Sequence, residues 1–134
     1  MTSRQLVEKY KWLTPRNVIT GRKIEFKNFT ELDYMAPGWR AAFGDQLCEE
    51  MNAVIRTWPI EEQEEFDITD IKEKWGRLCI YTNFTTDELE KVIEKFEALS
   101  TQTCYMCGAT PVIWSHNLPL CATCAEKFLN NSIY

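Results

Sequence analysis

Four cysteines near the C-terminal end of the sequence have the type and spacing most suited to chemistry. They form two Cys-x-x-Cys pairs separated by thirteen residues, and they are Cys104, Cys107, Cys121 and Cys124. A Cys-x-x-Cys turn brings both sulfurs to one side, and two such turns can surround Zn²⁺ with Zn–S distances of about 2.3 Å. The pattern therefore predicts a structural zinc site in a small ribbon, with Gly108 supplying a positive φ after the first pair.

Other uses of four thiolates fit this spacing less well. Iron–sulfur proteins commonly group three cysteines closely, and a thioredoxin-like motif needs a βαβ context. A catalytic zinc ion keeps one position open for water, whereas four thiolates fill its coordination sphere. His116, the only histidine, could be an alternative ligand, but we expect it at the surface of a hairpin between the two pairs.

The single histidine also argues against a metal-dependent nuclease, which needs a histidine base and further ligands. The sequence has no Gly-rich phosphate loop and no serine nucleophile elbow. Carboxylate pairs such as Glu49 and Glu50 lie on predicted polar faces, where solvated charge is expected. We therefore predict a non-enzymatic protein and keep a metal-dependent hydrolase as the least favoured alternative.

The remaining cysteines, Cys48 and Cys79, lie in apolar contexts and are predicted to be small buried hydrophobic residues. Six cysteines could also form three disulfides in a secreted protein. However, the metal-ligand spacing and the lack of an apolar segment in residues 1–5 favour a reducing cytoplasm. No apolar run reaches the roughly eighteen residues that span a membrane. We expect a cytoplasmic protein without a membrane partner.

Three helices are predicted before the cysteines. The clearest covers residues 37–58, between Pro37 in its first turn and Pro59 after its end. Its apolar residues recur at spacings of three and four: Trp39, Phe43, Leu47, Met51, Val54, Ile55 and Trp58. A shorter helix is expected over residues 3–12, and another begins at a capping-box pattern formed by Thr85 and Glu88. The acidic run at 61–65 is expected to be a solvated loop or a frayed turn.

Two strands are predicted over residues 66–71 and 78–82. Gly76 between them can take the positive φ of a hairpin turn, and imperfect alternation at 69–71 indicates a bulge. Residues 24–26 alternate like a further short strand. The resulting fold class is α+β, with amphipathic helices packed on a small antiparallel sheet and a C-terminal four-cysteine zinc ribbon. Residues 1–103 form the body with a basic N-terminal arm, and residues 104–134 form the ribbon and a C-terminal helix, docked on the body.

Charge is distributed unevenly over the chain, whose net charge is −5. Residues 1–30 carry seven basic and two acidic side chains, whereas residues 31–100 carry seven basic and seventeen acidic ones. The basic arm either contacts phosphates or covers the acidic body, and we favour the second interpretation. Its candidate binding residues are Arg16, Arg22 and Lys23.

A second candidate binding surface lies at the tip of the predicted hairpin. It combines basic residues with an aromatic one: Lys72, Lys74, Trp75 and Arg77. Such a group can stack on a base and contact phosphates, or it can anchor a protein interface. The alternative, which we favour slightly, is that Trp75 folds back onto the core while the charges keep the turn soluble. The ribbon tip at residues 114–119 is a third possible surface.

Several motifs together resemble those of small zinc-ribbon proteins from phages and prophages of Gram-positive bacteria. They are residues 10–16, 37–50 and 71–78, Cys104-x-x-Cys107-Gly108, and Leu120 with the second cysteine pair, so the likeness covers residues 10–124. The group has no assigned activity. The resemblance implies a phage accessory protein that binds, and in the stronger form inhibits, a host protein such as a nuclease of a defence system. The alternative is a zinc-ribbon protein that binds nucleic acid directly.

Overall fold

The computed structural model describes residues 1–17, 19–23 and 29–131. It confirms an α+β fold with two small antiparallel sheets and five α-helices among these residues. The predicted strand at 24–26 lies outside the described residues. In chain order the elements are α1 (Ser3–Lys9), η1 (Lys11–Leu13), η2 (Glu31–Tyr34), α2 (Pro37–Ile55), α3 (Ile60–Glu65), β1 (Ile68–Lys74), β2 (Arg77–Thr82), α4 (Asp87–Ser100), β3 (Ile113–Ser115), β4 (Leu118–Leu120) and α5 (Ala122–Asn131).

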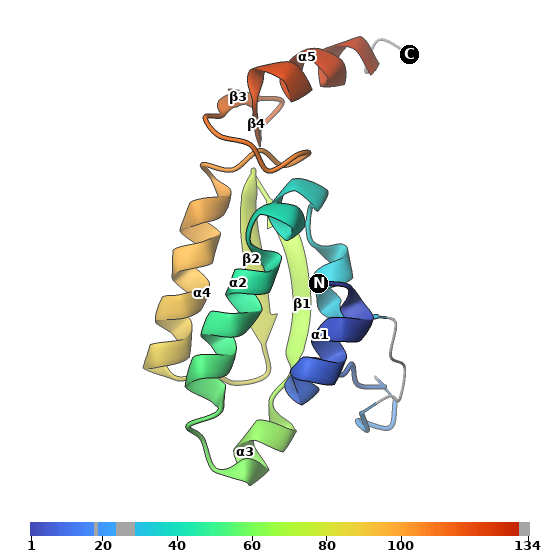
Figure 1. Ribbon diagram of the computed structural model, residues 1–134, viewed down its shortest axis with the longest axis vertical. Helices are drawn as coiled ribbons and strands as arrows, with labels where there is room; N and C mark the ends of the chain where they lie inside the picture. The colour runs from blue at the N-terminus through green and yellow to red at the C-terminus, as the bar shows by residue number, and fades with distance from the viewer. Residues whose placement is uncertain (18, 24–28, 132–134) are drawn as a thin grey trace.

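Helix α2 is the central helix of the body and begins at Pro37, as predicted. Most of the predicted apolar stripe is buried, from Trp39 to Ile55, while Val54 is half-buried. The helix ends at Ile55, three residues earlier than expected, because Trp58 precedes Pro59 and a residue before proline avoids the helical region. In Figure 1, α2 and α4 run side by side on one side of the β1–β2 hairpin.

The acidic run after Pro59 is a short helix, α3, and the prediction of a loop or a frayed turn there is wrong. Glu61 and Glu62 lie in its first turn, where the positive end of the helix dipole stabilises carboxylates. No residue of α3 is buried. The sequence shows no sign of this helix because helices are predicted from a periodic apolar stripe, and α3 buries no residue and has no such stripe.

Strands β1 and β2 pair through a two-residue turn in which Trp75 and Gly76 both have positive φ, 55° and 80°. This is the backbone of a hairpin turn whose twist matches that of the strands. Lys74 pairs with Arg77 next to the turn, so β1 extends three residues beyond its predicted end. The predicted bulge is confirmed by a shift of pairing between Ile68 and Asp70.

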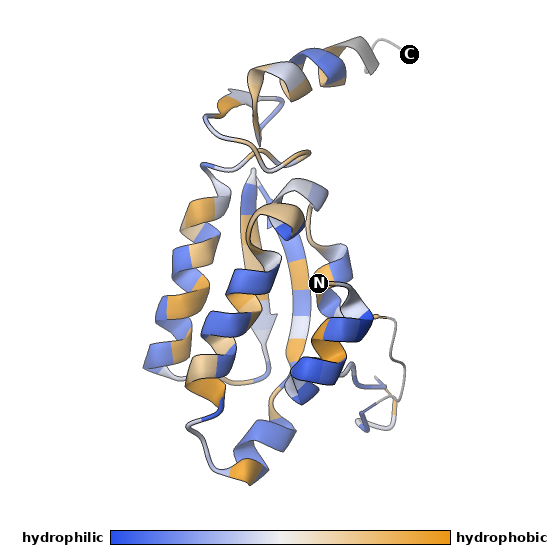
Figure 2. Ribbon diagram, viewed as in Figure 1, coloured by the Kyte–Doolittle hydropathy of each residue, from blue (hydrophilic) through white to orange (hydrophobic). Residues whose placement is uncertain are grey.

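The two faces of this hairpin differ in burial. One face is buried in the core through Ile68, Ile71, Leu78 and Ile80. Helix α4 packs against β2, and its apolar positions alternate with charged ones along the ribbon in Figure 2. Its N-cap is Thr86, whose hydroxyl accepts a hydrogen bond from the Leu89 amide at 3.2 Å. The N-cap therefore lies one residue later than expected, and the predicted capping box does not form, because the third helical residue is Leu89 and not Glu88.

Two side chains of α4 also complete the hydrogen bonding of β2. The Leu78 amide donates to Ser100 Oγ and the Ile80 amide donates to Glu97 Oε2, each at 2.9 Å. Burial raises the pKa of Glu97, while the bond from Ile80 opposes that rise. Two backbone donors of β2 that point away from β1 are thereby satisfied by α4.

Contacts between α2 and the segment around Cys104 join the body to the ribbon. The Gly38 amide donates to the Tyr105 carbonyl at 2.8 Å, and Trp39 Nε1 donates to the Thr103 carbonyl at 3.0 Å. A Cβ on Gly38 would overlap the carbonyl oxygen of Cys104 and lie 2.6 Å from the Gly108 nitrogen. The first helical turn of α2 and the first cysteine pair therefore approach backbone to backbone.

Candidate metal centre

The four cysteines of the predicted site come together in space. Their sulfur atoms all lie within 4.8 Å of one another, and this cluster could hold a metal ion. Cys104 is buried and Cys107 is exposed, while Cys121 and Cys124 are half-buried. The site thus lies at the surface of the ribbon, with one ligand anchored inside it.

The first cysteine pair is held by a tight turn. The Gly108 amide donates to the Cys104 carbonyl, and the Cys104 amide donates to the Ala109 carbonyl, each at 2.9 Å. Gly108 has a φ of 84°, as its place after the pair predicts, and its backbone lies against Gly38 and Ala42 of α2. These contacts fix the position of Cys104 relative to the body.

The second pair is positioned by the start of α5. The Ala125 amide donates to the Cys121 carbonyl at 2.9 Å, and the Cys124 amide lies 3.5 Å from Cys121 Sγ. Between the two pairs, the hairpin of β3 and β4 forms as predicted and brings Leu120 into the small buried cluster beside the cysteines. The ribbon therefore presents one pair from a loop and one from a helix N-terminus.

The thiols of Cys104 and Cys124 have very different pKa values. Burial raises the pKa of Cys104, but amide groups of Cys121, Cys107 and Met106 outweigh it and bring the pKa to about 6. Burial and the neighbouring thiols raise the pKa of Cys124 to about 12. A cation among the sulfurs would lower the pKa of all four thiols, because it favours the thiolate form of every ligand.

His116 lies at the tip of the β3–β4 hairpin, outside this group of ligands. Its side chain is exposed and contacts the Phe128 ring, with 4.8 Å between ring centroids. The expectation of a surface hairpin position is confirmed. With four cysteines as the ligand group, a bound ion has no open position for water, so the arrangement favours a structural role over a catalytic one.

Of the other two cysteines, Cys48 is fully buried in the core, as predicted. Burial raises the pKa of its thiol to about 12, which makes it unreactive. Cys79 is only half-buried, because it lies on the face of β2 opposite to Leu78 and Ile80. The prediction of full burial is therefore wrong for Cys79.

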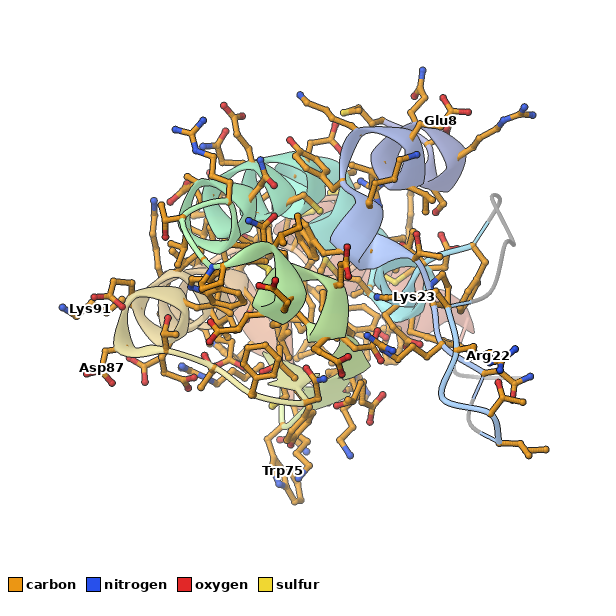
Figure 3. All side chains as sticks on the ribbon, turned by 90° about the horizontal axis from the view of Figure 1, so that it is seen from below. Glu8, Arg22, Lys23, Trp75, Asp87 and Lys91 are labelled. Carbon is orange, nitrogen blue, oxygen red and sulfur yellow. The ribbon has the colours of Figure 1, made fainter. Side chains whose placement is uncertain are left out.

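The candidate surface at the β1–β2 tip is exposed. Trp75 is 82% exposed and projects from the periphery of the molecule in Figure 3, so the expectation that it folds onto the core is wrong. Lys72 lies 3.5 Å from Asp70 and over the Tyr81 ring. Lys74 and Arg77 are both exposed, and neither forms an ion pair with another described residue.

The basic arm, in contrast, turns two of its three candidate residues toward the body. Lys23 Nζ donates to the carbonyls of Trp12, Thr14 and Phe66 and lies 3.7 Å from Asp67. This burial lowers the pKa of Lys23 to about 8, even though the Asp67 carboxylate opposes the shift.

Arg16 donates to the carbonyls of Gly21 and Glu64, whereas Arg22 is exposed and points outward in Figure 3. The interpretation that the arm covers the body therefore holds for Arg16 and Lys23. As a binding surface, the arm retains only Arg22 of the three predicted residues.

Two features of the structure have no counterpart in the sequence analysis. A cavity of about 560 Å³ lies between η1, α2 and α3, where Trp12, Lys23 and Gln63 line it. At the other end of the body, the Trp114 ring packs against the backbone of Gly76. Neither leaves a signal in a single sequence, because each depends on segments that are far apart in the chain.

Comparison of the chain with known protein families, with curated proteins and with solved structures found no match. Among the described helices, none combines the length and the apolar character needed to cross a membrane. The identity of the site must therefore be argued from its own chemistry.

Proposed function

We propose that the four cysteines hold a structural Zn²⁺. Thiolates select soft metals, and a tetrahedral set of four sulfurs suits zinc or an iron–sulfur centre. The cysteine spacing disfavours the iron–sulfur alternative. The convergence of the four sulfurs within 4.8 Å supports zinc binding, and the ion would tie the loop at Cys104 to the start of α5. Metal analysis of purified protein tests this proposal, with one zinc per chain expected and iron or no metal contradicting it.

We further propose that the protein is a non-enzymatic phage accessory protein. In the cytoplasm of the bacterial host, it engages and inhibits a host protein such as a nuclease of a defence system. The resemblance of its motifs to phage zinc-ribbon proteins supports this proposal. A closed thiolate site and the solvated carboxylates of the body support a role in binding.

Helix α3 is the observation on which this proposal depends most. Its four glutamates are exposed, and none forms an ion pair with another described residue; they are Glu61, Glu62, Glu64 and Glu65. The exposed N-terminal turns of α4 lie at the same end of the molecule, opposite to the ribbon (Figure 1). A concentrated negative surface of this kind is complementary to the basic channel in which a nuclease holds its substrate.

The test is a pull-down from host lysate with matched charge variants. The first variant, E61Q/E62Q/E64Q/E65Q, removes the α3 charges. The control variant removes four exposed glutamates that are scattered over other elements: E8Q/E49Q/E73Q/E126Q. Both variants change the net charge equally, so nonspecific electrostatic effects cancel in the comparison.

The wild-type protein and the control are expected to recover one host protein in stoichiometric amount and to inhibit its nuclease activity. The α3 variant is expected to lose both properties, and added salt should weaken the complex. Recovery of no partner by the folded protein would overturn the proposal. Equal recovery by both variants would overturn the assignment of α3 as the binding surface.

A further inference from the structure

The tip of the β1–β2 hairpin carries a tryptophan where its fold gives no reason for one. Trp75 has a φ of 55°, a conformation that favours asparagine or glycine and strains a bulky side chain. Its ring is nevertheless 82% exposed, so it contributes little packing in return. A strained and exposed aromatic residue indicates a role outside the folded core.

A second tryptophan, Trp114 of the ribbon, contacts the same hairpin turn. The Trp114 ring lies so close to Gly76 that a Cβ there would overlap it, and the same Cβ would lie 2.5 Å from the Asn117 carbonyl oxygen. Gly76 is buried by this contact, although it is part of an exposed turn. Trp114 itself is 53% exposed. The tips of the two hairpins therefore touch, because the Trp114 ring lies against Gly76, the residue that follows Trp75 in the turn.

Two basic residues lie directly before and after the turn formed by Trp75 and Gly76. Lys74 and Arg77 face each other across the first rung of the hairpin, on the exposed face of the sheet. Neither forms an ion pair with a carboxylate among the described residues, in contrast to Lys72, which lies 3.5 Å from Asp70. Arg77 interacts with the Glu97 carboxylate only at longer range. Exposed cations beside exposed aromatic rings are the two features that a single-stranded nucleic acid needs for stacking and phosphate contact.

We propose that this surface, formed by Trp75, Trp114, Lys74 and Arg77, binds single-stranded nucleic acid. Bases stack on the two indoles, and Lys74 and Arg77 contact the adjacent phosphates. A duplex is a poor ligand because its bases are already stacked and paired. With two phosphate contacts, the logarithm of the binding constant should fall with the logarithm of salt concentration at a slope of about −1.4.

A single-stranded partner fits the surface better than a protein does. A protein hot spot is a desolvated pocket surrounded by contacts that exclude water. Here the Trp75 ring stands free at the tip of a turn, and its neighbours are cations. The acidic body limits this binding to a short segment of strand, because phosphates beyond the tip approach carboxylates.

The experiment is fluorescence anisotropy with a labelled 12-nucleotide oligo-dT, oligo-rU and a duplex of the same length, in low salt and with the zinc-loaded protein. W75A is the principal variant, because Trp75 packs on nothing that the fold requires. I60A is its control, since Ile60 is also an exposed apolar residue and lies in α3. K74A/R77A is matched by K91A/R56A, which removes one exposed lysine and one exposed arginine elsewhere.

W75A is expected to weaken single-strand binding at least fivefold, whereas I60A leaves it unchanged. K74A/R77A should flatten the salt dependence, and K91A/R56A should keep it. Binding to the duplex as tight as to the single strand would overturn the proposal, as would equal affinity of W75A and wild type. If the oligonucleotides do not bind but W75A loses a captured host protein, the surface is a protein interface and the proposal is wrong. None of these results depends on the glutamate substitutions in α3, so the two proposals can fail separately.

Discussion

The two hairpins of the molecule have similar turns but very different support. Both turns place two consecutive residues at positive φ: Trp75 and Gly76 in the body, His116 and Asn117 in the ribbon. Among the described residues, the body hairpin rests on a core of 22 buried residues, whereas the cluster beneath the ribbon hairpin contains three: Cys104, Leu120 and Ala125. A hairpin needs more than its own turn to be stable in water, so each must obtain that stability from its surroundings.

The difference in burial indicates which interactions stabilise each part of the chain. In the body, aromatic rings close the end of the sheet, where Phe66 contacts Trp12, Trp58 and Phe84 at centroid distances of 5.5–5.7 Å. In the ribbon, the apolar side chains of β3 are largely exposed, with Ile113 and Trp114 each at 53%. Segments that bury so little rely on a cross-link or a metal. We therefore expect the body to depend on packing and the ribbon on its ligands.

Removal of the metal should have the largest effect, and it should be confined to the ribbon. Metal binding contributes about 10–16 kcal/mol to folding in zinc-finger peptides, far more than three buried residues supply. A chelator, or the substitution Cys104→Ser, should abolish hydrogen-exchange protection beyond residue 104 while β1, β2 and α4 stay protected. Cys79→Ser is the control, because Cys79 lies outside the cysteine cluster. Full hydrogen-exchange protection of the ribbon in the absence of metal would contradict the claim that the ribbon depends on its ligands.

Truncation of a core side chain should give the next largest effect. This effect should be confined to the body, whereas that of metal removal is confined to the ribbon. Phe66 is fully buried among three aromatic rings, so Phe66→Ala should cost about 3–5 kcal/mol of the free energy of unfolding. Urea denaturation measures this loss, while the metal content of the folded fraction should be unchanged. The exposed residue Ile60 supplies a control, since Ile60→Ala should change stability by less than about 0.5 kcal/mol. A loss of bound metal in Phe66→Ala below its unfolding transition would show that the two parts are not independent.

The substitution Gly38→Ala tests the contact between the two parts. An alanine in an open helix position stabilises by about 1 kcal/mol relative to glycine. At Gly38 the added methyl would overlap the Cys104 carbonyl oxygen, so a destabilisation of about 1–3 kcal/mol is expected instead. Thermal denaturation shows whether the substitution raises or lowers the melting temperature, and we expect it to be lower. A stabilised variant would mean that the ribbon can move away from α2 without loss.

The most gradual effect is a pH dependence that belongs to the body alone. Lys23 has a pKa of about 8 in the folded chain, because burial disfavours its charged form, against 10.5 for an unperturbed lysine. Between these values the unfolded chain binds more protons, so the free energy of unfolding should rise with pH by at most about 1.4 kcal/mol per unit. This contribution is complete above pH 10.5 and is lost as pH falls through 8. Urea titrations of wild type and Lys23→Met should differ by this slope, and parallel pH profiles would show that Lys23 is not buried.

Much of the fold could be predicted because its signals are local. The stripe from Trp39 to Ile55, the turn glycine Gly76 and the cysteine pairs each lie within one stretch of chain, and each has its predicted conformation. Helix α3 escaped prediction because it buries no residue and so has no amphipathic pattern.

The candidate surfaces were harder to predict because they depend on contacts between distant segments. The inward turn of Lys23 depends on Phe66, forty-three residues away. The exposure of Trp75 follows from the strand pairing, which directs the turn away from the core, and no feature of residues 72–77 alone reveals it. Composition identified the cluster of cations at this tip but could not say which of them form ion pairs.

The bonds from Leu78 and Ile80 to α4 have a consequence for the behaviour of the protein at high concentration. A two-stranded sheet has two edges, and an open edge can recruit a strand from another copy and begin a fibril. Ser100 and Glu97 occupy the amide groups through which an incoming strand would attach to β2. Helix α4 therefore protects that edge of the sheet against aggregation.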